Sequence, residues 1–118
     1  MDEIARIQRE RQAAHARLLG LGSRVYQAFL AMEGAAFADG ALPRKTKELV
    51  AVGISVVVNC EPCMQWHVEQ ALRCGATHRE VLEAIEVGIE MGGGPATVAA
   101  RFALRVLDRV APDGKKGA

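Results

Sequence analysis

The sequence predicts an all-α fold of about six helices, on the strength of three observations. Apolar residues recur at helical spacing along most of the chain, and residues typical of helix starts and stops separate the periodic segments. Only residues 48–58, which are rich in valine, have the composition of a strand. No second segment resembles a strand partner, and a lone strand would leave its backbone N–H and C=O groups unpaired. We therefore expect residues 48–58 to belong to a buried helix.

The first half of the chain predicts three helices. The apolar positions of the first are Ile4, Ile7, Ala14 and Leu18, and Gly20 and Gly22 end the pattern. Ser23 is a suitable N-cap for a second helix. The expected buried stripe of that helix consists of Val25, Tyr26, Phe29, Leu30 and Phe37. After a turn at residues 39–40, Pro43 suits the first turn of a third helix, because a missing N–H costs nothing there.

The second half predicts three more helices. Asn59 or Cys60 can cap the fourth, which has Pro62 in its first turn. Gly75 ends it, and the capping box at residues 77–80 (Thr-His-Arg-Glu) opens the fifth. The expected apolar stripe of the fifth helix is Val81, Leu82, Ile85, Ile89 and, in part, Val87. The run Gly-Gly-Gly-Pro at residues 92–95 breaks this helix, and the sixth runs from about residue 96 to 110.

Length and composition predict one small domain that spans residues 1–118, with its core at about 22–110. The Pro/Gly/Lys-rich residues 111–118 are expected to form a disordered tail. Aromatic residues make up only 4% of the chain, so the core must be aliphatic. Because a small aliphatic domain often completes its burial by self-association, we expect a homo-oligomer.

The charge balance and apolar pattern exclude several kinds of partner. Fifteen Lys and Arg against 14 Asp and Glu give a net charge of +1, which predicts neither nucleic acid nor a membrane surface as a partner. The chain starts without the apolar segment of a secretory signal, and the ten apolar-rich residues at 49–58 are too few to span a bilayer. We therefore expect a cytoplasmic protein. In that reducing compartment, a close pair of cysteines is typical of redox or metal-binding sites.

The residues that can carry chemistry are Cys60, Cys63, His67 and Glu48. Cys60 and Cys63 lie where a helix begins, and the unpaired N–H groups and positive dipole end there favour a thiolate. His67 lies one turn after Cys63 on the same helix face, so it can accept the thiol proton directly or through a water. Glu48 heads an apolar run, and we expect it to point inward and act as a further base behind His67.

Two alternatives compete with a redox dithiol. Cys60, Cys63 and His67, with Glu48 as a fourth ligand, could surround zinc. Structural zinc sites usually take their second ligand pair from a distant Cys- or His-rich segment, and this chain has none. The other alternative is a non-catalytic helical module in which the motif is idle.

Other reactive or aromatic residues are interpreted structurally. Cys74 is too far along the helix to pair with Cys63 and is expected to be a small buried hydrophobe near the helix end. His15 and His78 are expected to be solvated. Met64 and Trp66 are interpreted as packing residues beside the motif. The glycines at 92–94 lack the context of a phosphate loop and are expected to allow close helix packing.

The spacing of the four candidate residues resembles the signature of the AhpD-like alkylhydroperoxidases of the carboxymuconolactone decarboxylase family. Eleven residues separate Glu48 from Cys60, two separate Cys60 from Cys63, and three separate Cys63 from His67. Residues 42–49, 74–77 and 92–96 add to the resemblance, which covers about residues 22–108. It implies an all-helical fold that assembles as trimers or hexamers.

The resemblance also implies a cofactor-free enzyme that reduces peroxides or disulfides. Carried over, Cys63 is the peroxidatic thiolate, Cys60 is the resolving thiol, and Glu48 and His67 form a proton relay. The implied partners are a peroxide or disulfide substrate and an external dithiol, either lipoamide-type or a thioredoxin-like protein. Pro62 departs from the better-known peroxidases, which have a His before the second cysteine. This departure leaves disulfide reduction open as an alternative, whereas the decarboxylase members generally lack the cysteine pair.

Overall fold

The computed structural model describes residues 2–111 and contains six helices and no strand in that range. The helices are α1 (Glu3–Gly20), α2 (Arg24–Phe37), α3 (Arg44–Val57), α4 (Glu61–Arg73), α5 (His78–Gly92) and α6 (Gly94–Val110). The all-α prediction is therefore confirmed. Of the predicted tail at 111–118, only Ala111 lies within the described residues, where it caps α6 by donating its N–H to the Leu107 carbonyl. None of the described helices combines the length and apolar character needed to cross a membrane.

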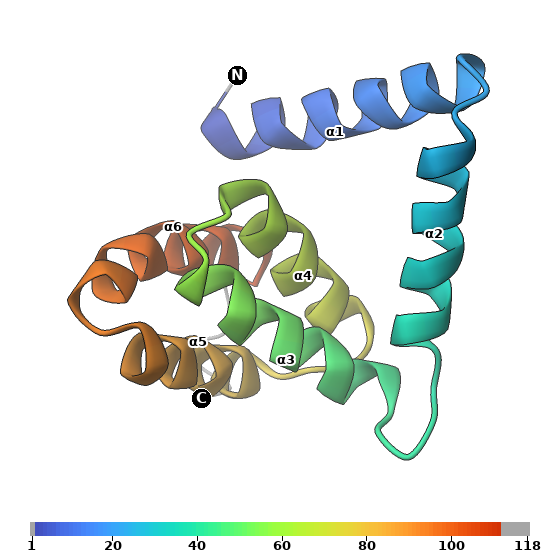
Figure 1. Ribbon diagram of the computed structural model, residues 1–118. Coiled ribbons are helices and arrows are strands. Elements are labelled where there is room, and N and C mark those ends of the chain that lie inside the picture. The colour runs from blue at the N-terminus through green and yellow to red at the C-terminus, as the bar shows by residue number, and fades with distance from the viewer. Residues whose placement is uncertain (1, 112–118) are drawn as a thin grey trace.

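Four helices, α3 to α6, pack together as a bundle, while α1 and α2 form an angled arm around it (Figure 1). α1 crosses one end of the bundle and is anchored by the buried Ile4 and Ile7. An ion pair between Asp2 and Arg109 also joins the start of α1 to the end of α6. α2 then runs along the side of the bundle and returns to the start of α3 (Figure 1). This arrangement sets α2 opposite α4, the helix that begins with the cysteine motif.

Side-chain caps set four of the six helix starts, and the sequence predicts those at Ser23 and Thr77. The Ala5 N–H donates to Asp2 at the start of α1 (2.8 Å), and the Tyr26 N–H donates to Ser23 at the start of α2 (3.1 Å). The capping box that opens α5 is complete, with both reciprocal hydrogen bonds of Thr77 and Glu80 present. Pro43 lies one position earlier than the predicted first turn: it is the extended N-cap residue just before α3. Its carbonyl accepts a hydrogen bond from the Lys47 N–H, and no side chain caps this helix start.

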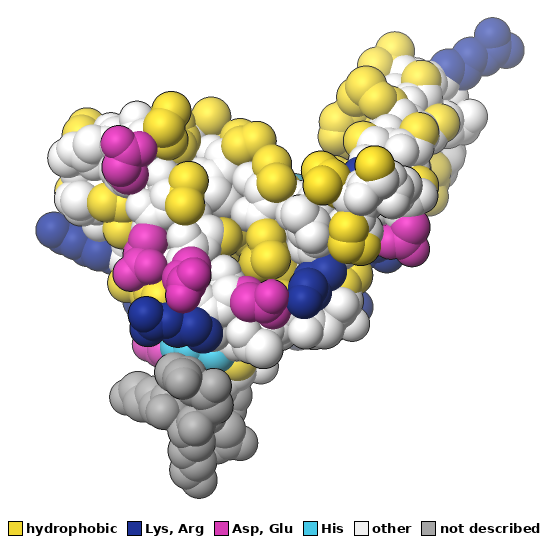
Figure 2. Space-filling view, turned by 90° about the horizontal axis from the view of Figure 1, so that it is seen from below, with side chains coloured by type: hydrophobic (Ala, Val, Ile, Leu, Met, Phe, Trp, Pro, Cys, Tyr) yellow, Lys and Arg dark blue, Asp and Glu magenta, His cyan; other side chains and the backbone are white. Residues whose placement is uncertain are grey.

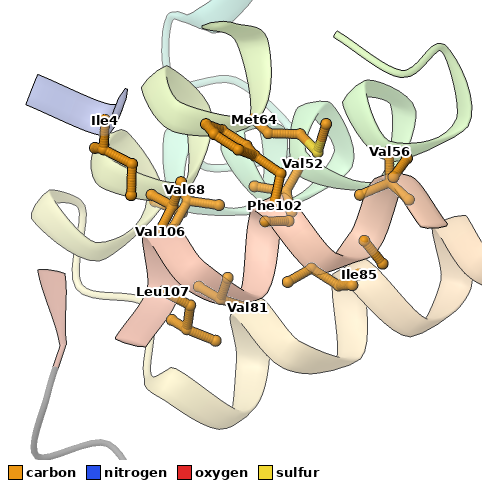
Figure 3. Close-up of a cluster of buried hydrophobic side chains, with 14 of the residues drawn as sticks. Ile4, Val52, Val56, Met64, Val68, Val81, Ile85, Phe102, Val106 and Leu107 are labelled. Atoms are coloured by element: carbon orange, nitrogen blue, oxygen red, sulfur yellow. The ribbon is translucent and has the colours of Figure 1, made fainter. Parts of the chain in front are cut away.

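The core is aliphatic and draws on α1 and on every helix of the bundle (Figure 3). Among the described residues, Phe102 is the only aromatic side chain in the buried cluster. The remaining labelled side chains in Figure 3 are Ile4, Val52, Val56, Met64, Val68, Val81, Ile85, Val106 and Leu107. The valine-rich segment is helical up to Val57, as predicted, but it is buried on one face only. Val52 and Val56 are fully buried, whereas Val50 and Ile54 on the opposite face are half exposed.

A close approach of two backbones joins α3 to α5. A Cβ atom on Gly88 would lie 2.7 Å from the carbonyl oxygen of Gly53, well inside van der Waals contact. Glycine is therefore required at position 88 for these helices to pack at this distance. The break after α5 is shorter than predicted: Gly93 alone, with φ of 69°, separates the two helices, and α6 begins at Gly94.

The predicted burial of α2 is wrong within this chain. α2 has no buried residue, and Val25 and Phe29 are 83% and 49% exposed. The helix is apolar on the predicted side, but it stands apart from the bundle (Figure 1), and its main contacts are with α1 and α3. Hydrophobic side chains consequently gather on the surface of both the bundle and the projecting arm (Figure 2).

Candidate active site

A single tight connection between α3 and α4 positions the first cysteine. Asn59 adopts a left-handed conformation with φ of 54°, which asparagine tolerates better than most residues. The Cys60 N–H then donates to the carbonyl of the buried Ser55 (3.1 Å), which ties the start of α4 back to α3. Cys60, and not Asn59, is consequently the N-cap of α4.

The two cysteines are joined by a disulfide within the first turn of α4. Their Cα atoms are 5.2 Å apart, a separation that lies within the normal range for disulfides. The Cys63 N–H also donates to the Cys60 sulfur at 3.2 Å, so the sulfur fills the place of a capping oxygen. Pro62 sits in this first turn, as expected, where its missing N–H leaves no donor unpaired.

His67 is held against Glu48 one turn further along α4. Its Nδ1 lies 2.7 Å from the Glu48 Oε1, and Glu48 is only 2% exposed. Because an ionised carboxylate can only accept, Nδ1 carries the proton and donates it, which leaves Nε2 of a neutral ring as an acceptor. The ring also stacks on Phe37 of α2, with centroids 5.3 Å apart and planes 18° apart. The predicted inward orientation of Glu48 is thus present, and both contacts fix the orientation of the imidazole.

Arg44 is a member of this cluster that sequence reasoning missed. Its Nε donates to the second Glu48 oxygen at 3.3 Å, and its terminal nitrogen donates to the side chain of the buried Gln70 at 3.1 Å. A buried carboxylate needs such partners to offset its loss of hydration. The signal was available in the sequence, because Arg44 and Glu48 are four residues apart and so lie on one helix face.

Two adjoining cavities lie between the arm and α4. The first, of about 500 Å³, is bordered by Cys63 and His67 on α4 and by residues of α1 and α2 such as Arg11 and Tyr26. The second, of about 400 Å³, is bordered by Arg44, Glu48 and Phe37. Leu30, Glu33, Trp66 and His67 border both cavities. Cys60 does not border either of these two, so Cys63 is the cysteine of the pair that lines the cavity beside His67.

The arm residues in these cavities had no signal in the sequence, because they precede the motif by dozens of positions. Trp66 differs from its neighbour in role: Met64 is fully buried packing, as expected, whereas Trp66 faces both cavities. On α1, His15 is exposed as expected and also lies 2.6 Å from the Tyr26 hydroxyl.

Two further expectations concern residues away from the cavities. His78 is not solvated: its side chain is 14% exposed and its Nε2 faces Asp108 at 3.9 Å, because the start of α5 folds against α6. Cys74 is a free cysteine at the C-cap of α4 and is partly buried. For the zinc alternative, residues 2–111 contain no group of three or more His, Cys, Asp and Glu side chains arranged to hold a metal ion.

Comparison with known proteins places the chain in a family. The model of the carboxymuconolactone decarboxylase family matches residues 23–106. An uncharacterized protein encoded in the cox locus of Paracoccus denitrificans is 45% identical over 89 residues, which are 75% of this chain and 80% of that protein. An uncharacterized protein of Cupriavidus necator is 43% identical over 81 residues, covering 69% of this chain and 72% of its own length.

Solved structures agree in fold. A carboxymuconolactone decarboxylase family protein of Legionella pneumophila superimposes with a TM-score of 0.88 at 30% identity, over 94% of this chain and 99% of that one. A Thermotoga maritima protein of the same family, with a possible involvement in antioxidative response, gives 0.83 at 25% identity over 95% of each chain. On the extent of the family match and the identity of these relatives, this chain belongs to the carboxymuconolactone decarboxylase family.

Proposed function

We propose that this protein is a cofactor-free dithiol oxidoreductase that reduces organic peroxides through a Cys60/Cys63 thiol–disulfide cycle. The observation that carries the proposal is one arrangement: Cys63 of the disulfide borders a cavity that His67 also borders, and His67 is hydrogen-bonded to the buried Glu48. The antioxidative involvement suggested for the Thermotoga maritima relative supports the same direction.

The oxidising half of the proposed cycle starts from the reduced dithiol. His67 accepts the Cys63 proton at Nε2, and the position of Cys63 in the first turn of α4 favours the resulting thiolate. The thiolate attacks the peroxide, so that a sulfur–oxygen bond forms as the O–O bond breaks. His67 returns the proton to the departing alkoxide, which leaves as an alcohol, and Cys63 is left as a sulfenic acid.

The second step closes the disulfide. Cys60 attacks the Cys63 sulfur, a sulfur–sulfur bond forms, and the hydroxyl group leaves as water with the Cys60 proton. The Cα separation of 5.2 Å in the bonded pair is the ordinary one for a disulfide. An external dithiol, lipoamide-type or carried by a thioredoxin-like protein, then reduces the disulfide and is itself oxidised to a disulfide.

Glu48 and Arg44 act in this scheme as positioning residues. The Glu48 carboxylate holds the Nδ1 proton of His67, which keeps Nε2 directed to proton exchange, and it stabilises the imidazolium that forms. Arg44 holds Glu48 in this orientation by donating to its other oxygen.

Disulfide reduction is the second candidate, and Pro62 is the observation that favours it. The residue before Cys63 in this chain has no titratable group, so proton delivery depends on His67 alone. A disulfide substrate needs less help from a proton donor, because its leaving group is a thiolate, which departs unprotonated more readily than an alkoxide does.

Self-association belongs to the same proposal. The apolar side of α2 is uncovered, and an apolar hollow of about 550 Å³ on α3 and α5 is bordered by Ile54, Val57, Val87 and Met91. An exposed apolar helix and an apolar hollow on one chain are complementary surfaces for a second copy.

The test is peroxide consumption by the pre-reduced protein with a lipoamide-type dithiol as reductant. Wild type should turn over, and Cys63→Ser should abolish the reaction. Cys60→Ser should consume one equivalent of peroxide and stop at a sulfenic acid that dimedone traps. Glu48→Gln should slow the first step by about 10²-fold, the usual scale for a disturbed acid–base relay.

Cys74→Ser is the matched control, because it removes a thiol outside the motif, and it should match wild type. Turnover by Cys63→Ser at the wild-type rate contradicts the proposal. Consumption of disulfides but not of peroxides by wild type selects the second candidate.

A further inference from the structure

The arm places one unpaired cation beside the reactive sulfur. Arg11 of α1 borders the same cavity of about 500 Å³ as Cys63. Its guanidinium stands over the Trp66 ring, 4.2 Å from the ring centroid. Among residues 2–111 it forms no ion pair, and its Nε is buried without a hydrogen-bond partner. A guanidinium donates up to five hydrogen bonds, so this one has unused capacity at the edge of the cavity.

The surroundings of Arg11 favour an anion as its partner. Burial is the main cause that lowers the pKa of Arg11, and the nearby Arg73 acts in the same direction. A cation that has lost hydration gains more from an anion than a solvated cation does. Glu69, whose charge opposes these effects, is itself engaged with Gln8 at 2.9 Å. Glu33 borders the cavity too, but it forms no ion pair with Arg11.

The rest of the cavity suits an apolar chain. Phe29, Leu30 and Pro62 contribute carbon surface between α2 and the start of α4. The volume lies within the range of about 300–1,000 Å³ that holds small organic ligands. Trp66 follows Cys63 by three residues, which sets their Cβ atoms about 5–6 Å apart. A short acyl chain therefore suffices to bridge the guanidinium on Trp66 and the sulfur of Cys63.

We propose that Arg11 is a specificity-determining residue that binds the carboxylate of an acyl-chain substrate whose reactive end reaches Cys63. This inference rests on the proposed function and names the substrate class. The carboxylate could belong to the oxidant, a fatty-acid hydroperoxide, or to the reductant, a dithiol acid. Either molecule presents the same head group and apolar chain to the cavity, so the experiment must separate the two.

The experiment compares charged and neutral members of two substrate pairs on the full chain. The oxidant pair is a fatty-acid hydroperoxide and its methyl ester, and the reductant pair is dihydrolipoate and dihydrolipoamide. Wild type should prefer the acid in one pair by about tenfold in kcat/KM, the value of one charge-assisted hydrogen bond. Arg11→Gln should abolish that preference while leaving the rate with the neutral member within about twofold.

Two variants serve as controls. Arg9→Gln makes the same charge change at an exposed position of α1 that does not border the cavity, and it should keep the full preference. Arg11→Lys retains the charge and should recover part of the preference, which a purely structural role for Arg11 would not predict. A preference in the oxidant pair identifies the peroxide as the carboxylate carrier, and a preference in the reductant pair identifies the dithiol.

A binding measurement keeps this inference separate from the proposed chemistry. Trp66 is the single tryptophan of the chain, so its fluorescence reports occupancy of the cavity without turnover. The oxidised protein should bind octanoate about tenfold more tightly than methyl octanoate, and Arg11→Gln should bind both equally. If wild type reduced no peroxide but still bound octanoate more tightly than methyl octanoate, only the proposed function would be refuted. Equal binding of acid and ester by wild type, or a preference that survives in Arg11→Gln, overturns the inference.

Discussion

α2 and α6 are apolar helices of similar length, 14 and 17 residues, yet they differ in how much of their apolar side is buried. α6 buries seven side chains at the centre of the bundle, whereas α2 buries none. α6 packs against α3, α4 and α5, whereas the main contacts of α2 are with α1 and α3 alone and are far fewer. The comparison shows that an apolar stripe identifies the side of a helix that avoids water, but the rest of the chain decides whether that side is covered.

The bundle and the arm also contribute different parts of the candidate site. The bundle supplies the reactive groups: Glu48 from α3, and Cys60, Cys63 and His67 from α4. The arm supplies the opposite wall of the cavities. We therefore expect substitutions in the bundle to affect folding or chemistry, and substitutions in the arm to affect substrate selection and assembly.

The largest effect should come from the buried side of α6, near its C-terminal end. Leu107→Ala removes a fully buried side chain, and we expect it to lower the free energy of unfolding by about 2–5 kcal/mol. Urea denaturation followed by circular dichroism measures the change. Leu104→Ala, at an exposed position on the same helix, is the control and should cost much less. Equal losses in both variants would show that the packing of α6 is not as described.

The next largest effect concerns glycine-to-alanine substitutions, which we expect to destabilise the bundle at α5 and to stabilise the arm at α2. Gly88→Ala puts a methyl group against the Gly53 carbonyl, and we expect it to lower the free energy of unfolding by about 1–3 kcal/mol. In α2, a Cβ on Gly34 meets nothing within 4 Å. Gly34→Ala should therefore stabilise the protein by up to about 1 kcal/mol through helix propensity alone. Stabilisation by both variants in thermal unfolding would contradict the close α3–α5 contact.

A substitution on the apolar side of α2 should have a smaller effect on the free energy of unfolding. Phe29→Ser should change the free energy of unfolding of dilute protein by less than about 0.5 kcal/mol, because the side chain is half exposed. If a second copy covers this side, the same variant should shift sedimentation velocity profiles toward smaller species at high concentration. A loss of stability as large as that of Leu107→Ala in dilute solution would mean that α2 is covered within its own chain.

The smallest effect concerns the capping box of α5. The backbone N–H of Thr77, together with Lys45, lowers the pKa of Glu80. A carboxyl whose pKa is lower in the folded than in the unfolded chain stabilises the fold above its unfolded pKa. This stability is lost as the pH falls through the folded pKa. The urea midpoint of Glu80→Gln should accordingly depend less on acid pH than that of wild type. Glu86→Gln, at an exposed position of the same helix, should retain the wild-type dependence.

Local features of the sequence were sufficient to predict the six helices. Ser23, Thr77 and Gly75 each act within a few residues, so the prediction required no knowledge of the fold. The pairing of Glu48 with His67 was also within reach, because two helices joined by a short loop bring them together. The valine-rich composition around Val56 favours a strand by propensity alone. The segment is nevertheless a helix, because one face of it packs against α5 and α6.

The remainder depends on contacts that the sequence does not encode locally. Arg11 precedes Cys63 by 52 positions, and only the angle between α1 and the bundle brings it to Trp66. His78 was predicted to be solvated because its partner helix was unknown. The exposure of Phe29 could not be predicted for a different reason: α2 has the expected apolar pattern, but no helix among residues 2–111 covers that side.

The place of the disulfide within a single helical turn has a kinetic consequence. Cys60 caps α4, and Cys63 is the cysteine of the pair that borders the cavity. Under the proposed mechanism, oxidant and reductant must therefore visit the same opening one after the other, with the protein storing two electrons between visits. Double-reciprocal plots at several reductant concentrations should then be parallel, the signature of ping-pong kinetics, and an excess of either substrate should slow the other by competition for one entrance.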